Sequence, residues 1–186
     1  MKEKILEGAI NVFRAKGLKF TMDDLAKEMK MSKKTIYTVF MDKNDLLCNM
    51  VDYVFDLIKK EEDKIYYNDS LSLEEKLRGI LGVLPDSYNN FDYQTLYQFK
   101  DKYPDAYDKL AYRLDVGWEK TIELIKEGQK QGIVRNIDID IFKISYEATI
   151  TRLIITNTLE KKGLDYPTAF SHVVDFMIHG LIVKGE

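Results

Sequence analysis

The sequence has little of several residue types, and each scarcity excludes a class of protein. Its 186 residues include a single cysteine, Cys48, so an internal disulfide is impossible. One cysteine and two histidines are too few for the usual zinc cages, and we expect no metal or other cofactor. The longest apolar runs fall short of the ~20 residues that cross a bilayer. The start MKEKILEGAI has no signal-peptide core. We therefore expect a cytoplasmic protein with no membrane partner.

Charge is plentiful in both signs but unevenly distributed. The net charge is −3, which argues against a protein that binds polyanions over its whole surface. Residues 1–47 contain ten Lys or Arg against seven Asp or Glu, a net charge of +3, so the remainder has −6. This asymmetry suggests that only the N-terminal part meets nucleic acid.

Apolar residues recur at helical spacing along almost the whole chain, and no segment alternates as a strand would. The sequence therefore predicts an all-α protein of about nine helices. Two domains are expected, a three-helix domain over 1–47 and a larger helical domain over 48–186. The predicted helices span about 2–16, 21–29, 32–40, 42–64, 72–85, 89–100, 104–131, 139–161 and 166–183.

The helix predicted at 32–40 has an unusual charge at its start. The helices that begin at Thr21 and Asp42 each have a polar cap followed three residues later by an acid. Ser32 is also a cap, but Thr35 replaces the acid and the two residues between them are lysines. Because a helix N-terminus has partial positive charge, the missing acid costs up to ~1 kcal/mol. A phosphate from outside the protein would restore that stabilisation.

Two short helices joined by Lys30-Met31, the second basic at its start, form a helix-turn-helix pattern. In this motif the second helix enters the DNA major groove, and its first residues reach base edges. Ile36 and Phe40 are expected to pack inward. The outward residues would then be Lys33, Lys34, Tyr37 and Thr38.

The segment FTMDDLAKEMKMSKKTIYTVFMDKNDLL, residues 20–47, resembles the DNA-binding domain of the TetR family of transcriptional regulators. It contains the family's Thr, hydrophobic-Ala pair, Ser-Lys-x-Thr-hydrophobic-Tyr-x-x-Phe run and following Lys. The resemblance implies a homodimer that binds a double-stranded DNA operator, with a small effector in the C-terminal domain. We assign DNA binding to Thr21, Ser32, Lys33, Lys34, Thr35, Tyr37, Thr38 and Lys43. The resemblance implies that Thr35, Tyr37 and Lys43 contact phosphates.

Three positions depart from the family pattern. Lys30 occupies a turn position that is often Gly, and a positive φ there would cost about 1 kcal/mol. Met22 replaces a frequent hydroxyl, and Asp23 places an acid near the expected DNA surface. These departures affect contacts from the second helix more than those from the third.

Aromatic residues are concentrated in the middle of the chain, where they form either an ordinary core or a ligand pocket. Tyrosine is an awkward core residue because its hydroxyl needs a partner. Acidic surroundings favour a cationic or neutral effector that is amphipathic or aromatic. The candidate pocket residues are Tyr93, Tyr97, Tyr107, Trp118 and Tyr146.

The last two predicted helices are apolar on more than one face, so each needs a partner beyond its own core. Two such helices per chain predict a four-helix interface in a two-fold dimer. The candidate interface residues are Ile150, Ile154, Phe170, Val174, Met177 and Leu181. His172 and His179 share a face, and interface histidines are favoured over a pH-sensitive or metal pair.

These patterns favour a ligand-responsive DNA-binding regulator, a repressor that an effector releases from its operator. One alternative is a regulator of the same fold that a protein partner controls without an effector. Another is a helical enzyme with an incidental helix-turn-helix. The sequence offers no paired acid and base residues for it, so we expect no enzyme.

Overall fold

The computed structural model describes residues 1–84, 99–156 and 158–183. In these ranges the regular elements are helices, and the extended pairing is a single isolated antiparallel bridge between Val134 and Ile182. The all-α prediction is confirmed. In the same ranges, no helix is long and apolar enough to cross a membrane.

The N-terminal helices form where their caps predicted. Side chains of Thr21, Ser32 and Asp42 each accept a hydrogen bond from the backbone N–H three residues later. The helix after Ser32 is shorter than predicted and ends at Tyr37. The elements are α1 (Lys2–Lys16), the 3₁₀ helix η1 (Gly17–Lys19), α2 (Met22–Glu28) and α3 (Lys33–Tyr37).

The C-terminal part is built around the 24-residue helix α4, which packs against α1, α5 and α7. The domain boundary expected between residues 47 and 48 falls inside this helix. The remaining elements are α4 (Lys43–Tyr66), α5 (Leu73–Leu81), α6 (Phe99–Lys102), α7 (Pro104–Asp115), α8 (Glu119–Lys130), α9 (Ile139–Ile155), α10 (Thr158–Lys162) and α11 (Tyr166–Leu181).

Two long predicted helices are each divided. The helix predicted at 104–131 breaks between α7 and α8, where Val116 is extended and Gly117 has φ 84°. The helix predicted at 139–161 ends at an extended Thr156 before α10 begins. The helix predicted at 89–100 lies outside the described residues except for its last two, which begin α6.

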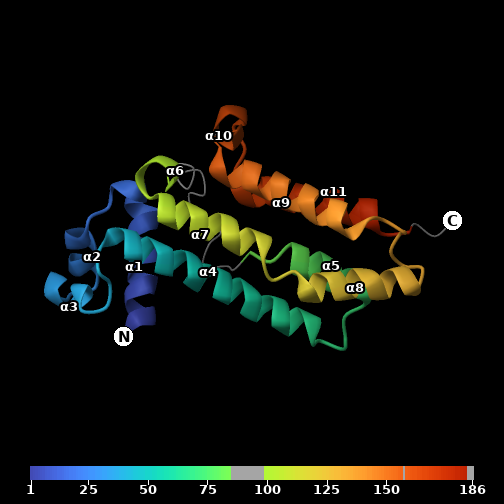
Figure 1. Ribbon diagram of the computed structural model, residues 1–186, viewed down its shortest axis with the longest axis horizontal. Coiled ribbons are helices and arrows are strands. Elements are labelled where there is room, and N and C mark those ends of the chain that lie inside the picture. The colour runs from blue at the N-terminus through green and yellow to red at the C-terminus, as the bar shows by residue number, and fades with distance from the viewer. Residues whose placement is uncertain (85–98, 157, 184–186) are drawn as a thin grey trace.

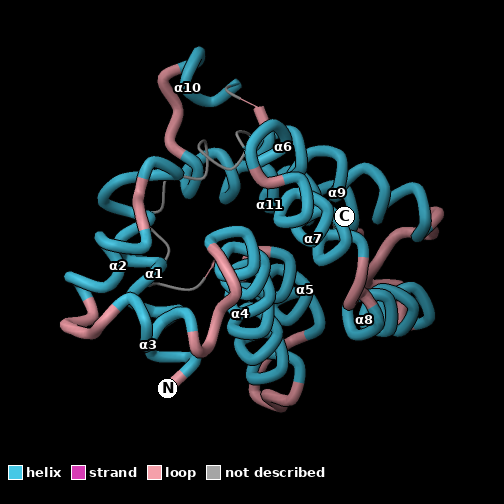
Figure 2. Tube along the Cα trace, turned by 60° about the vertical axis from the view of Figure 1, so that its left-hand side comes forward, coloured by secondary structure: helices cyan, strands magenta, loops and turns pink. Residues whose placement is uncertain are grey.

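The molecule is elongated, with α1–α3 gathered at one end (Figure 1). From there α4 runs into the body, and the C-terminus lies at the opposite end (Figure 1). The tube view in Figure 2 shows α4 beside α5, and α10 protruding away from them. One continuous helix therefore links the helix-turn-helix to the larger part of the chain.

Candidate DNA-binding surface and effector cavity

Helix α3 is held in place by its apolar side. Ile36 is fully buried, and Phe40 and Leu25 are buried with it in one core. The opposite side of α3 is exposed, with Tyr37 at 45% exposure. The structure therefore brings to one surface the predicted residues Ser32, Lys33, Lys34, Tyr37 and Thr38.

The turn before α3 has the left-handed backbone conformation that is costly for a residue other than glycine. Lys30 has φ 51°, in the left-handed region, and its N–H donates to the Lys27 carbonyl over 3.2 Å. A residue that sequence reasoning missed is Gly8 of α1. A Cβ there would lie 2.0 Å from Met29 Sδ, so a larger residue would displace the Met29 side chain that follows α2.

The predicted threonines are partly engaged inside the motif. Thr35 Oγ1 lies 2.8 Å from Ser32 Oγ, and Thr38 Oγ1 donates to the Thr35 carbonyl over 2.6 Å. Thr21 caps α2 in a reciprocal capping box with Asp24. These contacts fix hydroxyl orientation at the exposed surface, and any contact with DNA must be compatible with them.

Lys33 already has an acidic partner. Its Nζ lies 3.0 Å from Asp23 Oδ2, and this hydrogen bond raises the pKa of Lys33. Both side chains are largely exposed, so the pair contributes little to stability. Lys34 has no ion-pair partner among the described residues.

Lys43 points its ammonium into the protein. Nζ donates to the Leu18 carbonyl over 2.7 Å and to the Phe20 carbonyl over 2.5 Å. It also lies 4.2 Å from the centre of the Phe20 ring and 5.3 Å from that of Tyr103. Burial lowers the pKa of Lys43. In this structure the ammonium fastens the start of α4 to the segment before α2 and to α7, rather than facing outward as a phosphate contact would.

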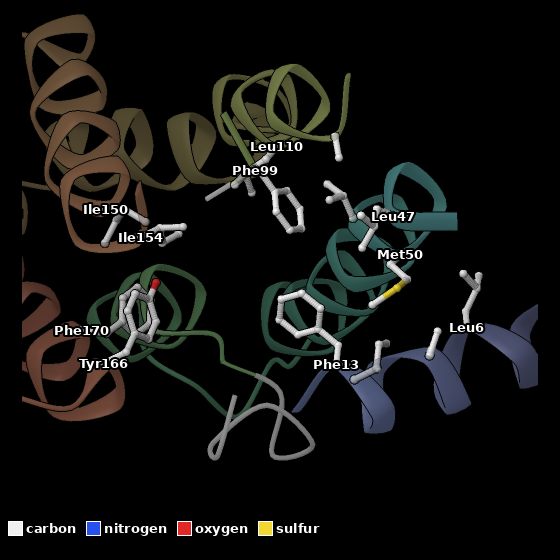
Figure 3. Close-up of a cluster of buried hydrophobic side chains, with 14 of the residues drawn as sticks. Leu6, Phe13, Leu47, Met50, Phe99, Leu110, Ile150, Ile154, Tyr166 and Phe170 are labelled. Atoms are coloured by element: carbon white, nitrogen blue, oxygen red, sulfur yellow. The ribbon is translucent and has the colours of Figure 1, made fainter. Parts of the chain in front are cut away.

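A narrow cavity of about 180 Å³ lies alongside α4. Its α4 lining runs from Leu47 to Glu62, a length of about 22 Å at the ~1.5 Å rise of a helix. Two lining residues, Ile10 and Phe13, belong to α1 of the N-terminal domain. Figure 3 shows Phe13 and Phe99 near this end, with Ile150, Ile154, Tyr166 and Phe170 further along. The cavity thus extends from the helix-turn-helix domain to α9 and α11.

The predicted aromatic pocket is only partly reproduced. Trp118 and Tyr146 line the cavity and contact edge-to-face, with ring centres 5.3 Å apart. Tyr107 is half-buried but does not line the cavity. Tyr93 and Tyr97 lie outside the described residues. Most of the remaining lining is aliphatic.

Two aromatic hydroxyl groups are buried in the lining. The Tyr146 hydroxyl donates to the Leu81 carbonyl over 2.5 Å. Tyr166, which also lines the cavity, stacks on Phe170 with ring centres 5.6 Å apart. Burial raises the pKa of Tyr146 and of Tyr166 well above the ordinary tyrosine value, so both phenols are neutral at physiological pH.

Sequence reasoning missed the main polar group of the cavity, Glu62. It is only 8% exposed, and its Oε2 accepts from Lys59 Nζ over 2.7 Å. Lys59 also donates to the Gly117 carbonyl over 2.6 Å, at the break between α7 and α8. Burial raises the pKa of Glu62, although Lys59 opposes this. Its spacing in the sequence could have indicated its burial, because Glu62 continues the helical apolar stripe of Val51, Val54 and Ile58.

The predicted dimer residues pack within their own chain. Ile150, Ile154 and Phe170 line the cavity of their own chain, and Val174 and Leu181 are buried in the same core. Met177 is half-buried against that core. These six residues thus lie on the side of α9 and α11 that faces the core of their own chain. The exposed apolar side contains Ile141, Ile144 and Phe176, which are 60%, 58% and 75% exposed. His172 and His179 are exposed on α11 as well.

Comparison with known proteins agrees with these features. Residues 5–49 match the profile of the family described as "Bacterial regulatory proteins, tetR family". The HTH-type transcriptional regulator YvaF of Bacillus subtilis (strain 168) is 27% identical over 186 residues, which cover 100% of this chain and 98% of that protein.

Solved structures share the fold over nearly the full length. Regulatory protein TetR from Rhodobacter sphaeroides has a TM-score of 0.75 at 15% identity, covering 97% of this chain and 98% of that one. The transcriptional regulator FadR from Bacillus subtilis, solved in complex with stearoyl-CoA, has a TM-score of 0.57 at 17% identity, covering 97% and 99%.

The fold and the N-terminal motif define a helix-turn-helix transcriptional regulator. More narrowly, residues 5–49 match the TetR family, as the segment 20–47 predicted, and the whole chain shares its fold with a solved regulatory protein TetR. Proteins of this family are regulators and not enzymes, so the prediction that the chain is no enzyme is confirmed.

Proposed function

We propose that the chain is a homodimeric repressor that binds a double-stranded DNA operator in the cytoplasm and leaves it when a small effector occupies the cavity beside α4. The observation that most supports this is the composition of the cavity wall. Ile10 and Phe13 of the N-terminal domain line the same space as Trp118 and Tyr146 of the body. An occupant of this space touches both parts of the molecule.

The proposed DNA-binding surface is the exposed side of α3. Lys34 and Tyr37 provide a cation and a hydroxyl that no described ion pair occupies. Lys33 reaches DNA by exchanging Asp23 for a phosphate or a base edge, and Ser32, Thr35 and Thr38 lie beside it. Phosphate contacts would supply the negative charge that the start of α3 lacks. Thr21 and the backbone of Lys43 flank this surface from α2 and α4.

The proposed dimer surface is the exposed apolar side of α9 and α11. Ile141, Ile144 and Phe176 are too large and too exposed to be left in water at no cost. A second copy can cover them by presenting the same residues across a two-fold axis. Gly180 has open space where a Cβ would point, which permits close approach of a partner helix.

The proposed signal passes through α4 and α1. Phe13 contacts Phe99 of α6, with ring centres 6.2 Å apart, and Lys43 fastens the start of α4 to Phe20. An effector that fits better when these contacts are rearranged shifts the population toward that state by its difference in affinity. FadR of Bacillus subtilis, which shares this fold, was solved with stearoyl-CoA bound.

The test is DNA binding by matched charge and hydroxyl variants. Lys34→Ala and Tyr37→Phe are expected to weaken binding to an operator fragment in fluorescence anisotropy at several salt concentrations. The control is Lys126→Ala, which removes the same charge from an exposed position on α8. Equal loss of affinity in Lys34→Ala and Lys126→Ala, or no change in either, would refute the assigned surface.

A further inference from the structure

The α4 wall of the cavity has one polar region, at its end, whereas α7 contributes Arg113, which pairs with Asp52 and Asp56, and α8 contributes Thr121. From Leu47 to Ile58 the residues that α4 contributes are apolar, and Lys59 and Glu62 follow them. Lys59 is the outer member of this pair, since its side chain is 36% exposed against 10% for Glu62. The deeper group of the pair is therefore the carboxylate.

The carboxylate of Glu62 can accept further hydrogen bonds. Among the described residues, Lys59 is its one hydrogen-bond donor and bonds only Oε2. A carboxylate accepts several hydrogen bonds, and Oε1 is not among the fully enclosed unpartnered atoms of the described residues, so water or a ligand can reach it. The Tyr146 hydroxyl already donates its hydrogen bond to the Leu81 carbonyl. A donor for Oε1 must then come from water or from a ligand.

The aromatic residues beside Glu62 suit a positive charge. Tyr146 and Trp118 line the same cavity as Glu62 and contact each other. Trp118 follows Gly117, whose carbonyl accepts from the same Lys59 that donates to Glu62. Aromatic ring faces attract cations, most strongly where water is excluded. A carboxylate with two aromatic side chains is the combination that recognises an ammonium group in an apolar pocket.

On the basis of the proposed function, we infer that the effector is an amine with a compact apolar body, whose ammonium group is held by Glu62 beside Trp118 and Tyr146. Its apolar part extends along α4 toward Phe13. The volume of about 180 Å³ fits a small hydrophobic group, since an apolar cavity of ~150 Å³ admits benzene.

An anionic effector fits this end of the cavity less well. Lys59 already donates to Glu62 and to the Gly117 carbonyl. An acid docked on Lys59 would place its charge beside Glu62, and like charges at this distance repel. An ammonium group instead adds the donor that Oε1 lacks.

The test uses three probes of one shape: benzylamine, benzyl alcohol and benzoate. Calorimetric titration of the wild-type chain is expected to show benzylamine binding about tenfold more tightly than benzyl alcohol, because hydrogen bonds to charged groups are the stronger ones. Glu62→Gln is expected to remove this difference. The control is Glu61→Gln, which changes a neighbouring acid that pairs with Lys64 at the surface.

Acidification gives a second measurement on the unmodified chain. The pKa of Glu62 lies above its ordinary 4.5 because of burial, with Lys59, Lys120 and Asp63 as the other charges that act on it. The preference for benzylamine over benzyl alcohol is expected to disappear as the pH falls through that raised pKa. A preference that persists in acid would count against Glu62.

The outcomes separate this inference from the proposed function. Equal binding of benzylamine and benzyl alcohol, a preference for benzoate, or no binding of any probe would overturn the amine assignment. Operator binding is measured on the same samples without a probe, and Glu62→Gln is expected to retain it. A chain that binds its operator but prefers benzoate remains a regulator with a different effector.

Discussion

Lys33 of α3 and Asp23 of α2 form an ion pair across the helix-turn-helix, with Nζ 3.0 Å from Oδ2. Asp23, the acid that departs from the family pattern, therefore pairs with Lys33, one of the lysines assigned to DNA binding. Exposed pairs of this kind are weak, so DNA can displace the carboxylate, but the exchange reduces the net gain. Asp23 and DNA therefore compete for the ammonium group of Lys33.

Removing this competition is expected to strengthen DNA binding. Asp23→Asn frees Lys33 and removes a negative charge from the surface, so affinity for any duplex should rise several-fold and the salt slope should steepen by about one unit. Anisotropy titrations at several salt concentrations measure both. Glu28→Gln, an exposed acid on the same helix, is the control. Weaker binding by Asp23→Asn would mean that the pair positions Lys33 for DNA.

Lys43 is expected to matter first for stability. Lys43→Met keeps the aliphatic stem but removes the donor to the Leu18 and Phe20 carbonyls. Losing these half-buried hydrogen bonds should cost about 1–3 kcal/mol in the free energy of unfolding. Urea denaturation measures the change, and Lys27→Met at an exposed site is the comparison. A variant of unchanged stability that loses DNA affinity would restore Lys43 as a direct phosphate contact.

The capping box of α2 should make the motif acid-sensitive. Asp24 accepts from Lys16 Nζ over 2.6 Å and from the Thr21 backbone N–H over 2.8 Å, and these bonds lower its pKa from 3.8 to about 2. The ionised form is thus favoured in the folded state. The resulting stabilisation is complete above pH 3.8 and is lost as the pH falls toward 2. Stability differences between wild type and Asp24→Asn, measured by urea denaturation, should shrink over this interval. An offset that stays constant from pH 6 to pH 2 would show that Asp24 acts by packing alone.

The exposed apolar side of α9 and α11 should control assembly. Phe176→Glu places a charge where the proposed partner would lie, and should convert dimers to monomers in analytical ultracentrifugation at micromolar concentration. Tyr112→Glu is the matched control, because Tyr112 is a similarly exposed aromatic residue on α7 at 62% exposure. If Phe176→Glu remains dimeric while Tyr112→Glu dissociates, the interface lies on α7.

Helix-capping contacts could be predicted from the sequence, because they join residues that are close along the chain. The cap Thr21 and its acid Asp24 formed as predicted, because a cap and its partner lie within one turn. The break at Gly117 was missed because the helical spacing of Tyr107, Leu114 and Trp118 continues across it. Periodicity describes which residues share a face but is insensitive to a turn that preserves the phase.

The sequence could not predict which of the two apolar faces of a helix packs against the core. Helices α9 and α11 are apolar nearly all round, so spacing alone does not distinguish Ile150, which faces the core, from Ile144, which is exposed. That distinction depends on where α5 and α9 pack against α11. Glu62 was overlooked for a related reason, since it lies in the charged run KKEEDK, whose other members suggest a solvated surface.

Ile10 and Phe13 make the cavity a property of the entire chain rather than of its C-terminal half. The two halves are therefore not interchangeable modules. A chimera that joins the C-terminal part of this chain to the DNA-binding domain of another regulator would place different side chains at those two positions. Under the proposed function, its response to an effector would change together with its target sequence, unless both residues were grafted back.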